Sequence, residues 1–294
     1  MYKRFKLIHF ILQFVVIPLI IFLVFYFKPK IDFSAVSVSF LLYLWLGILL
    51  MPINWLLEFT KWKVILKTLK LSDSQAGKSF ASGILSEFLI PGIPSNFIGR
   101  IFYFENQDRF KLSAWIQISN LGQFLITLFF GIFSLLYLNF KLSSNSFYLI
   151  LGFFLFMLIF ILLKKFHIIK LPKEIQNLSF KKSDFKPTSL LLLLSLIRFL
   201  IFSIQFGLIL HSFSIVFDFQ LLTYIWISYL LIAFSPSLFL GNLVIRESVT
   251  VSIFQLGNYP VIPVLYAAFL IWLVNNFIPV CIAWCYLTLF KNLK

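Results

Sequence analysis

The stretch Pro91-Gly-Ile-Pro-Ser-Asn-Phe-Ile-Gly-Arg100 breaks an apolar segment that otherwise runs over residues 79–99. A second stretch, Pro236-Ser-Leu-Phe-Leu-Gly-Asn-Leu-Val-Ile-Arg-Glu247, breaks the apolar segment 219–256 in the same way. Proline removes a backbone donor and glycine loosens a helix, so neither segment predicts one continuous helix. Backbone groups freed inside a membrane must be satisfied by protein or by a water-filled cavity. Both segments therefore predict re-entrant hairpins made of broken helices.

The composition assigns the chain to the membrane proteins. Of its 294 residues, 61% are hydrophobic and only 12% are charged, and its mean hydropathy is +0.99. Long apolar runs lack the polar face that a water-soluble helix needs, which excludes an ordinary soluble domain. The net charge of +15 does not indicate nucleic-acid binding. The basic residues lie between apolar segments and not in a patch interleaved with exposed aromatics.

The apolar runs set the number of membrane spans. A helix needs about 20 apolar residues to cross the hydrocarbon core. The sequence predicts an all-α polytopic membrane protein with about six full spans and two re-entrant broken-helix hairpins. The six predicted spans cover residues 7–27, 34–57, 112–137, 146–164, 188–212 and 262–290.

The distribution of basic residues predicts the orientation. With both termini in the cytoplasm, 20 of the 25 Lys and Arg residues lie on the cytoplasmic side. The exceptions are Lys28, Lys30, Lys141 and Arg246 outside and Arg198 within a span. Cytoplasmic loops carry such an excess of positive charge, so we expect cytoplasmic termini.

The two broken segments also resemble each other. Pro94-Ser-Asn-Phe-Ile-Gly99 and Pro236-Ser-Leu-Phe-Leu-Gly241 share Pro, Ser, Phe and Gly at identical spacing, 142 residues apart. We predict a first transmembrane repeat over residues 1–140, with its hairpin at 79–99. A second repeat covers residues 141–294, with a basic cytoplasmic loop at 164–187 and its hairpin at 219–256. Because each repeat would have an odd number of spans, three, the second copy would insert upside down relative to the first. Transporters built from such inverted repeats bind substrate near the midplane of the membrane.

Five ionisable residues stand out within or beside apolar runs: Glu87, Arg100, Arg198, Arg246 and Glu247. A charge at the bilayer centre costs at least about 2.5 kcal/mol, so each needs a partner or a function. We expect Glu87 to pair with Arg100 and Glu247 with Arg198; purely structural ion pairing is the alternative for all four.

Arg100 and Arg246 end the two broken segments, and a guanidinium group binds phosphate oxygens bidentately. We therefore predict a lipid head-group site made by these arginines with Glu87, Glu247 and Arg198. Snorkelling of Arg100 to the cytoplasmic surface is the other interpretation. The hairpin backbone would add contacts through Pro91, Gly92, Pro94, Gly99, Pro236 and Gly241.

The end of the second predicted span carries Glu58, Lys61, Trp62 and Lys63. Charged residues beside a tryptophan are typical of the membrane–water interface, and we interpret this group as an interfacial helix end. The sequence contains no phosphate-binding loop, nucleophile elbow or metal-ligand spacing. We therefore expect no catalytic residues, no metal and no cofactor.

The two motifs resemble those of a known family, the lysylphosphatidylglycerol synthase transmembrane-region proteins, also called flippase-like membrane proteins. The first motif of the resemblance is the Pro-Gly stretch that ends at Arg100, preceded by a span that ends in Lys61-Trp62. The second motif is the segment Pro236–Glu247, in which Gly241 is followed by Arg246-Glu247. The first motif departs from the family pattern because Arg100, and not an acidic residue, follows Gly99.

The resemblance implies a lipid flippase or translocator that moves or presents a phospholipid, or another anionic amphiphile, between leaflets. It also implies a homodimer, a bacterial inner (cytoplasmic) membrane, and a separate lipid-synthesising enzyme, because the aminoacyltransferase domain of the best understood relatives is not part of this sequence. The alternative is a membrane-embedded transferase, or an accessory subunit of one, that acts on lipid-linked substrates.

Overall fold

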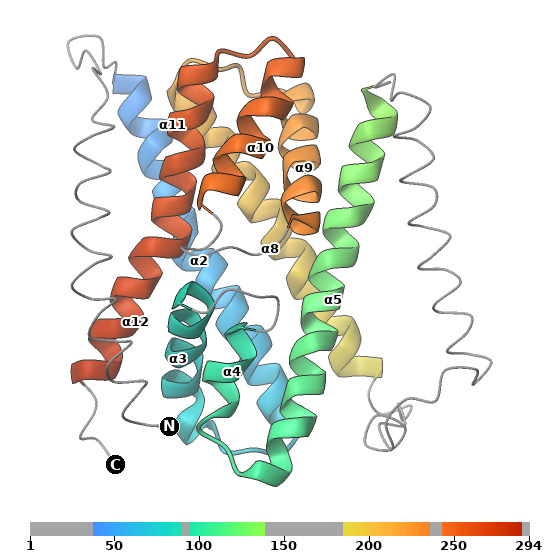
Figure 1. Ribbon diagram of the computed structural model, residues 1–294, viewed down its shortest axis with the longest axis vertical. Helices are drawn as coiled ribbons and strands as arrows, with labels where there is room; N and C mark the ends of the chain where they lie inside the picture. Colours follow the sequence, from blue (N-terminus) through green and yellow to red (C-terminus); the bar gives the residue numbers. More distant parts are fainter. Residues whose placement is uncertain (1–37, 90–94, 139–184, 236–242, 290–294) are drawn as a thin grey trace. The chain divides into compact units, whose positions relative to one another are not determined.

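The computed structural model describes residues 38–89, 95–138, 185–235 and 243–289. Over these ranges the chain is helical and contains no strand (Figure 1). The result confirms the all-α class. The structure is described below within these ranges.

Four helices are long and apolar enough to cross a membrane. Three are continuous, and the fourth is made by α11, a π-helical turn η5 and α12, with a change of direction at the turn (Figure 1). The bounds are α2 Val38–Thr68, α5 Asn106–Tyr137, α8 Phe185–Ser212, α11 Val261–Trp272, η5 Leu273–Phe277 and α12 Ile278–Leu289. They correspond to four of the six predicted spans, and the predicted spans 7–27 and 146–164 lie outside the described residues.

Helix α2 extends well past the predicted end of its span at residue 57. It continues to Thr68, and both Glu58 and Lys61 are buried inside the helix bundle. Trp62 is also fully buried, and its indole N–H donates to the hydroxyl of Ser79 at 3.0 Å. The prediction of a helix end at these residues was wrong, because α2 continues past them. Glu58 and Lys61 form an ion pair with each other inside the bundle, as described below.

Each of the two broken segments forms a pair of helices that pack on each other. The first helix pair consists of α3 (Ala76–Leu89), entered through the short 3-10 turn η2 (Asp73–Gln75), and α4 (Ser95–Ile101). The second helix pair consists of α9 (Phe219–Phe234) and α10 (Leu243–Leu256). The prolines and glycines predicted to line the breaks, Pro91, Gly92, Pro94, Pro236 and Gly241, lie outside the described residues.

Small residues bring α3 and α4 together. A Cβ atom on Gly99 would collide with the backbone carbonyl of Ser82, and one on Gly83 would lie 2.6 Å from Cγ of Arg100. The amide of Gly99 donates to the hydroxyl of Ser86 at 3.2 Å. Close backbone approach through Gly and Ser is typical of helix contacts inside membranes. Gly99 therefore fixes the first pair by its lack of a side chain.

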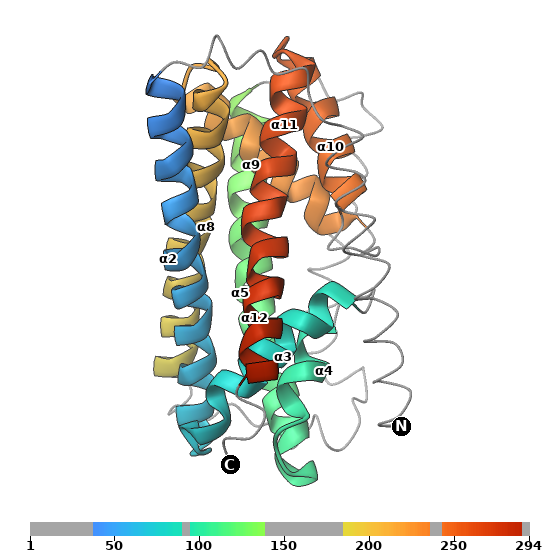
Figure 2. The same ribbon diagram turned by 90° about the vertical axis from the view of Figure 1, so that its left-hand side faces the viewer.

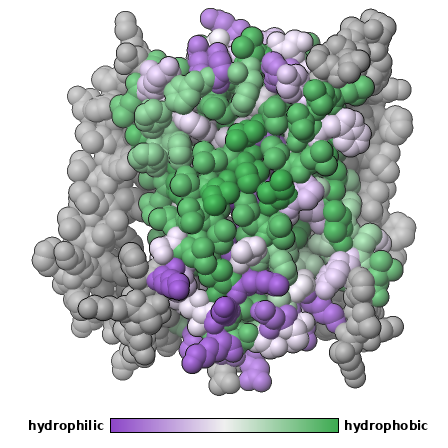
Figure 3. Space-filling view, turned by 180° about the vertical axis from the view of Figure 1, so that it is seen from behind, coloured by the Kyte–Doolittle hydropathy of each residue, from purple (hydrophilic) through white to green (hydrophobic). Residues whose placement is uncertain are grey.

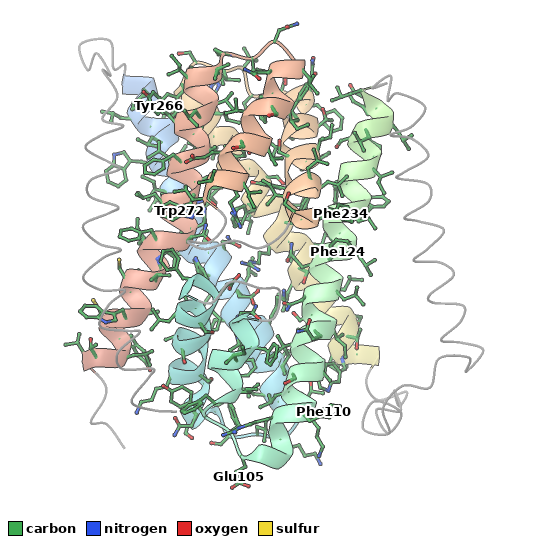
Figure 4. The ribbon with its side chains drawn as sticks, viewed as in Figure 1. Glu105, Phe110, Phe124, Phe234, Tyr266 and Trp272 are labelled. Atoms are coloured by element: carbon green, nitrogen blue, oxygen red, sulfur yellow. The ribbon has the colours of Figure 1, made fainter. Side chains whose placement is uncertain are left out.

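The two helix pairs lie at opposite ends of the described bundle (Figures 1 and 2). α3 packs on α12, whereas α9 packs on α5 and α10 packs on α11. Figure 4 shows Phe124, Phe234 and Trp272 at the level between the pairs. The ring of Phe234, at the end of α9, lies 5.5 Å from that of Phe124 on α5. The broken ends of both pairs therefore face the middle of the bundle.

The outer face of α2 and α8 is apolar. Figure 3, which views this face, shows hydrophobic residues over the middle and hydrophilic residues gathered at both ends. The exposed side chains include Trp45, Leu49, Leu56, Leu193 and Ile197. Such a band suits contact with lipid tails, and it supports the assignment of the chain to a membrane.

Candidate functional site

A single carboxylate, Glu58 on α2, holds three cations. Its Oε1 accepts from Nη2 of Arg100 at 3.0 Å, and its Oε2 accepts from Nη1 of Arg198 at 2.9 Å. The Nζ atom of Lys61, one turn further along α2, lies 3.3 Å from the same Oε2. Glu58 therefore joins α2, α4 and α8, and it leaves the three cations with an excess of positive charge.

Arg100 is enclosed by the first helix pair and α2. Its guanidinium carbon lies 5.1 Å from the ring centre of Phe80 and 5.5 Å from that of Trp62, within the range of cation–π attraction. Its side chain is only 4% exposed, whereas that of Arg198 is 21% exposed. Arg100 therefore ties α4 to α2, and Arg198 is the more accessible of the two arginines.

Arg198 also begins a chain of amide side chains. Its Nε donates to Oδ1 of Asn54 at 2.9 Å, and the Asn54 amide lies 3.4 Å from Oδ1 of Asn275. The Asn275 amide in turn donates to Oε1 of Gln205 at 3.0 Å. Asn275 belongs to the π-helical turn η5, and such turns are frequent at functional sites. This chain fixes the orientation of the Arg198 guanidinium relative to α2 and η5.

Glu87, near the broken end of α3, lies within electrostatic range of Arg100, Arg198 and Arg246. Its side chain is exposed, and within the described part of the chain it forms no ion pair. The ring of the next residue, Phe88, lies 6.3 Å from that of Trp272, which Figure 4 shows between the two helix pairs. Glu87 is therefore a free carboxylate beside a group of arginines in the middle of the bundle.

Arg246 lies in the first turn of α10 and is half-buried. Its Nε is buried without a hydrogen-bond partner, and no other described residue forms an ion pair with it. Glu87 and Arg198 lie within its electrostatic range, and so does the phenol of Tyr229. A cation at a helix N-terminus meets the positive end of the helix dipole. Arg246 is thus a cation that forms no ion pair with a described residue, although Glu87 lies within its electrostatic range.

These groups form the central cluster, defined as Glu58, Lys61, Glu87, Arg100, Arg198 and Arg246. Four cations and two carboxylates give the cluster a formal net charge of +2. Glu247 is not part of it, because it forms no ion pair with a described residue and is not among the groups that interact electrostatically with Glu87 or Arg246. Adjacent residues on a helix point about 100° apart, which separates Glu247 from Arg246.

The observed ion pairs differ from the expected ones. Arg100 and Arg198 pair with Glu58, where Glu87 and Glu247 were expected as their partners. Arg100 turns inward and does not snorkel to the surface. The structure nevertheless brings four of the five predicted site residues into one cluster.

The sequence reasoning missed Glu58, Lys61 and Gln205 as members of this buried polar group. The spacing of Asn54, Glu58 and Lys61 could have indicated two of them, because these polar residues recur at helical spacing opposite the apolar face of α2. A stripe of polar residues on an otherwise apolar helix favours the bundle interior over the membrane surface.

Comparisons with known proteins leave the family open. No family model matches the chain. Neither the curated proteins nor the solved structures include a significant match.

Proposed function

We propose that this protein is a lipid translocator that carries the head group of an anionic amphiphile through the central cluster while the tails stay in the bilayer. The observation that carries the proposal is Arg246, a half-buried guanidinium group that forms no ion pair with a described residue and lies within electrostatic range of the accessible Arg198. A phosphate between these two arginines would supply the missing acceptors through charge-assisted hydrogen bonds.

The arrangement of the helices supports this function. The order span, helix pair, span occurs twice, and the pairs lie at opposite ends with their broken ends facing the middle. In our proposal these are re-entrant hairpins of an inverted repeat, as in transporters that bind substrate where broken helices meet. The proposal includes six spans, cytoplasmic termini in a bacterial cytoplasmic membrane, and membership of the flippase-like family that the motifs resemble.

The roles of the cluster residues follow from their accessibility. Arg198 and Arg246 would contact the phosphate directly, since both are partly accessible. Glu58 and Arg100 would act as positioning residues, because their side chains are buried and already paired. Exposure of the cluster first to one leaflet and then to the other, by movement of the two helix pairs, would transfer the head group.

A leaflet-exchange assay tests the proposal. Purified protein is placed in liposomes that contain a trace of fluorescent phosphatidic acid, and external dithionite reports how much fluorophore reaches the outer leaflet. We expect rapid exchange with the unaltered protein and exchange near that of empty liposomes with Arg246→Gln.

The matched control is Lys63→Gln, which removes the same charge from an exposed position on α2. It should exchange lipid like the unaltered protein. Equal exchange by Arg246→Gln and the unaltered protein would refute the proposed site. A covalently altered lipid recovered after the assay would instead point to a transferase.

A further inference from the structure

The charge balance of the central cluster indicates which head group it accepts. We infer, on the basis of the proposed function, that the ligand is a dianion: a phosphomonoester or diphosphate head group, and not the single phosphodiester of ordinary phospholipids.

The first step of the argument is the residual charge. The carboxylate of Glu58 faces three cations and neutralises only one of them. Glu87 offsets one more, and Arg246 adds another cation at the far side of the cluster. A net charge of +2 is unfavourable in a cluster whose Lys61 and Arg100 are buried, and two negative charges would neutralise it. A monoanionic phosphodiester would leave one cation uncompensated.

The second step is the supply of donors. Arg246 has its Nε buried without an acceptor among the described residues, and the partly accessible Arg198 lies within its electrostatic range. α10 begins three residues before Arg246, so the positive end of its dipole adds to the guanidinium charge. A phosphomonoester has three terminal oxygens and spreads two charges over them, which suits several donors converging from different helices.

The third step concerns Glu87, which distinguishes a dianion from a zwitterion. Arg100 on α4, Arg198 on α8, Arg246 on α10 and Glu58 on α2 are the charged groups within its electrostatic range. Against a dianion, Glu87 is a like charge that weakens binding. Against a zwitterionic head group, the same carboxylate would bind the ammonium group. Removing its charge therefore has opposite effects in the two cases.

The test measures binding of soluble short-chain lipids to the purified protein by isothermal titration calorimetry at pH 8. The probes are dihexanoyl phosphatidic acid, dihexanoyl phosphatidylglycerol and dihexanoyl phosphatidylethanolamine. We expect phosphatidic acid to bind at least about tenfold more tightly than phosphatidylglycerol, as one further charge-assisted contact implies. Glu87→Gln should strengthen binding of phosphatidic acid several-fold.

The outcomes separate this inference from the proposed function. Equal affinity for phosphatidic acid and phosphatidylglycerol, with both lost in Arg246→Gln, overturns the dianion and keeps the translocator. Phosphatidylethanolamine binding that Glu87→Gln abolishes also overturns the dianion, in favour of a zwitterion. Glycerol 3-phosphate is the control for a water-soluble source. If it binds as tightly as phosphatidic acid, the dianion is supported and the lipid of the proposed function is contradicted.

Glu87 is exposed and unpaired within the described residues, so Glu87→Gln should fold normally. The unaltered protein could prefer phosphatidic acid as expected while the Arg246→Gln variant binds it with the same affinity. In that case the ligand lies elsewhere and the inference is overturned. Lys63→Gln again serves as the charge-matched control.

Discussion

Replacing Glu58 by Gln should destabilise the protein more than any other single change of one carboxylate in the described helices. Gln keeps the shape of the side chain but removes the negative charge that faces Lys61, Arg100 and Arg198. Lys61 and Arg100 are 2% and 4% exposed at the side chain, so they would remain buried without a counter-charge. Breaking a buried ion pair in this way costs about 3 to 5 kcal/mol.

Thermal unfolding in detergent, followed by tryptophan fluorescence, measures the effect. About 1 kcal/mol shifts the Tm of a soluble protein of comparable size by a few degrees, so we expect a decrease on the order of 10 °C for Glu58→Gln. The matched control is Glu247→Gln, which removes a half-buried carboxylate that forms no ion pair with a described residue and should leave Tm nearly unchanged.

Adding Lys61→Met to Glu58→Gln should recover part of the loss, because one uncompensated cation disappears with it. A Tm for Glu58→Gln within one or two degrees of that of the unaltered protein would refute the reasoning, as would a double variant less stable than Glu58→Gln alone.

Three further variants test the packing of α3 on α4, the chain of amide side chains and the unpaired Arg246. Gly99→Ala should force α4 away from α3 and cost about 1 to 3 kcal/mol in the free energy of unfolding. Its control is Gly122→Ala, whose new Cβ would lie at an ordinary 3.5 Å from Leu192. Equal Tm values for the two variants would contradict the close packing of α3 and α4. Asn275→Leu should cost about 1 to 3 kcal/mol by leaving Nδ2 of Asn54 and Oε1 of Gln205 without the partner that Asn275 provides. Asn276→Leu, which loses only a bond to its own helix, should cost less, and the reverse order of Tm would count against the polar chain. Arg246→Gln should leave Tm unchanged or raise it, because it removes an unpaired charge, and a marked decrease would reveal an internal partner.

Much of the fold could be predicted from apolar run length and from Pro and Gly. Four of the six predicted spans correspond to long apolar helices in the described residues, and both broken segments consist of two helices. The end of α2 could not be found in this way. A hydropathy scale assigns Glu58 and Lys61 to the end of a span, because both residues are charged. It does not take into account that Glu58 pairs with Arg100 and Arg198, which are distant in the sequence.

The structure brings four of the five predicted site residues together, but the ion pairs that they form differ from the predicted pairs. Intramembrane charges are few, so Glu87, Arg100, Arg198 and Arg246 could be recognised individually. Which carboxylate faces which arginine depends on contacts between residues as far apart as Glu58 and Arg198, 140 positions in sequence. No local pattern encodes such a contact, and for that reason the predicted partners of Arg100 and Arg198 were replaced by Glu58.

The position of a bound phosphate is the decisive measurement. A structure determined by cryo-electron microscopy in the presence of short-chain phosphatidic acid would locate it. We expect the phosphate oxygens within hydrogen-bond distance, about 2.7 to 2.9 Å, of the guanidinium nitrogens of both Arg198 and Arg246, between the two helix pairs. A phosphate found only at the ends of the bundle, with Arg246 closed on Glu87, would contradict the central cluster as the head-group site.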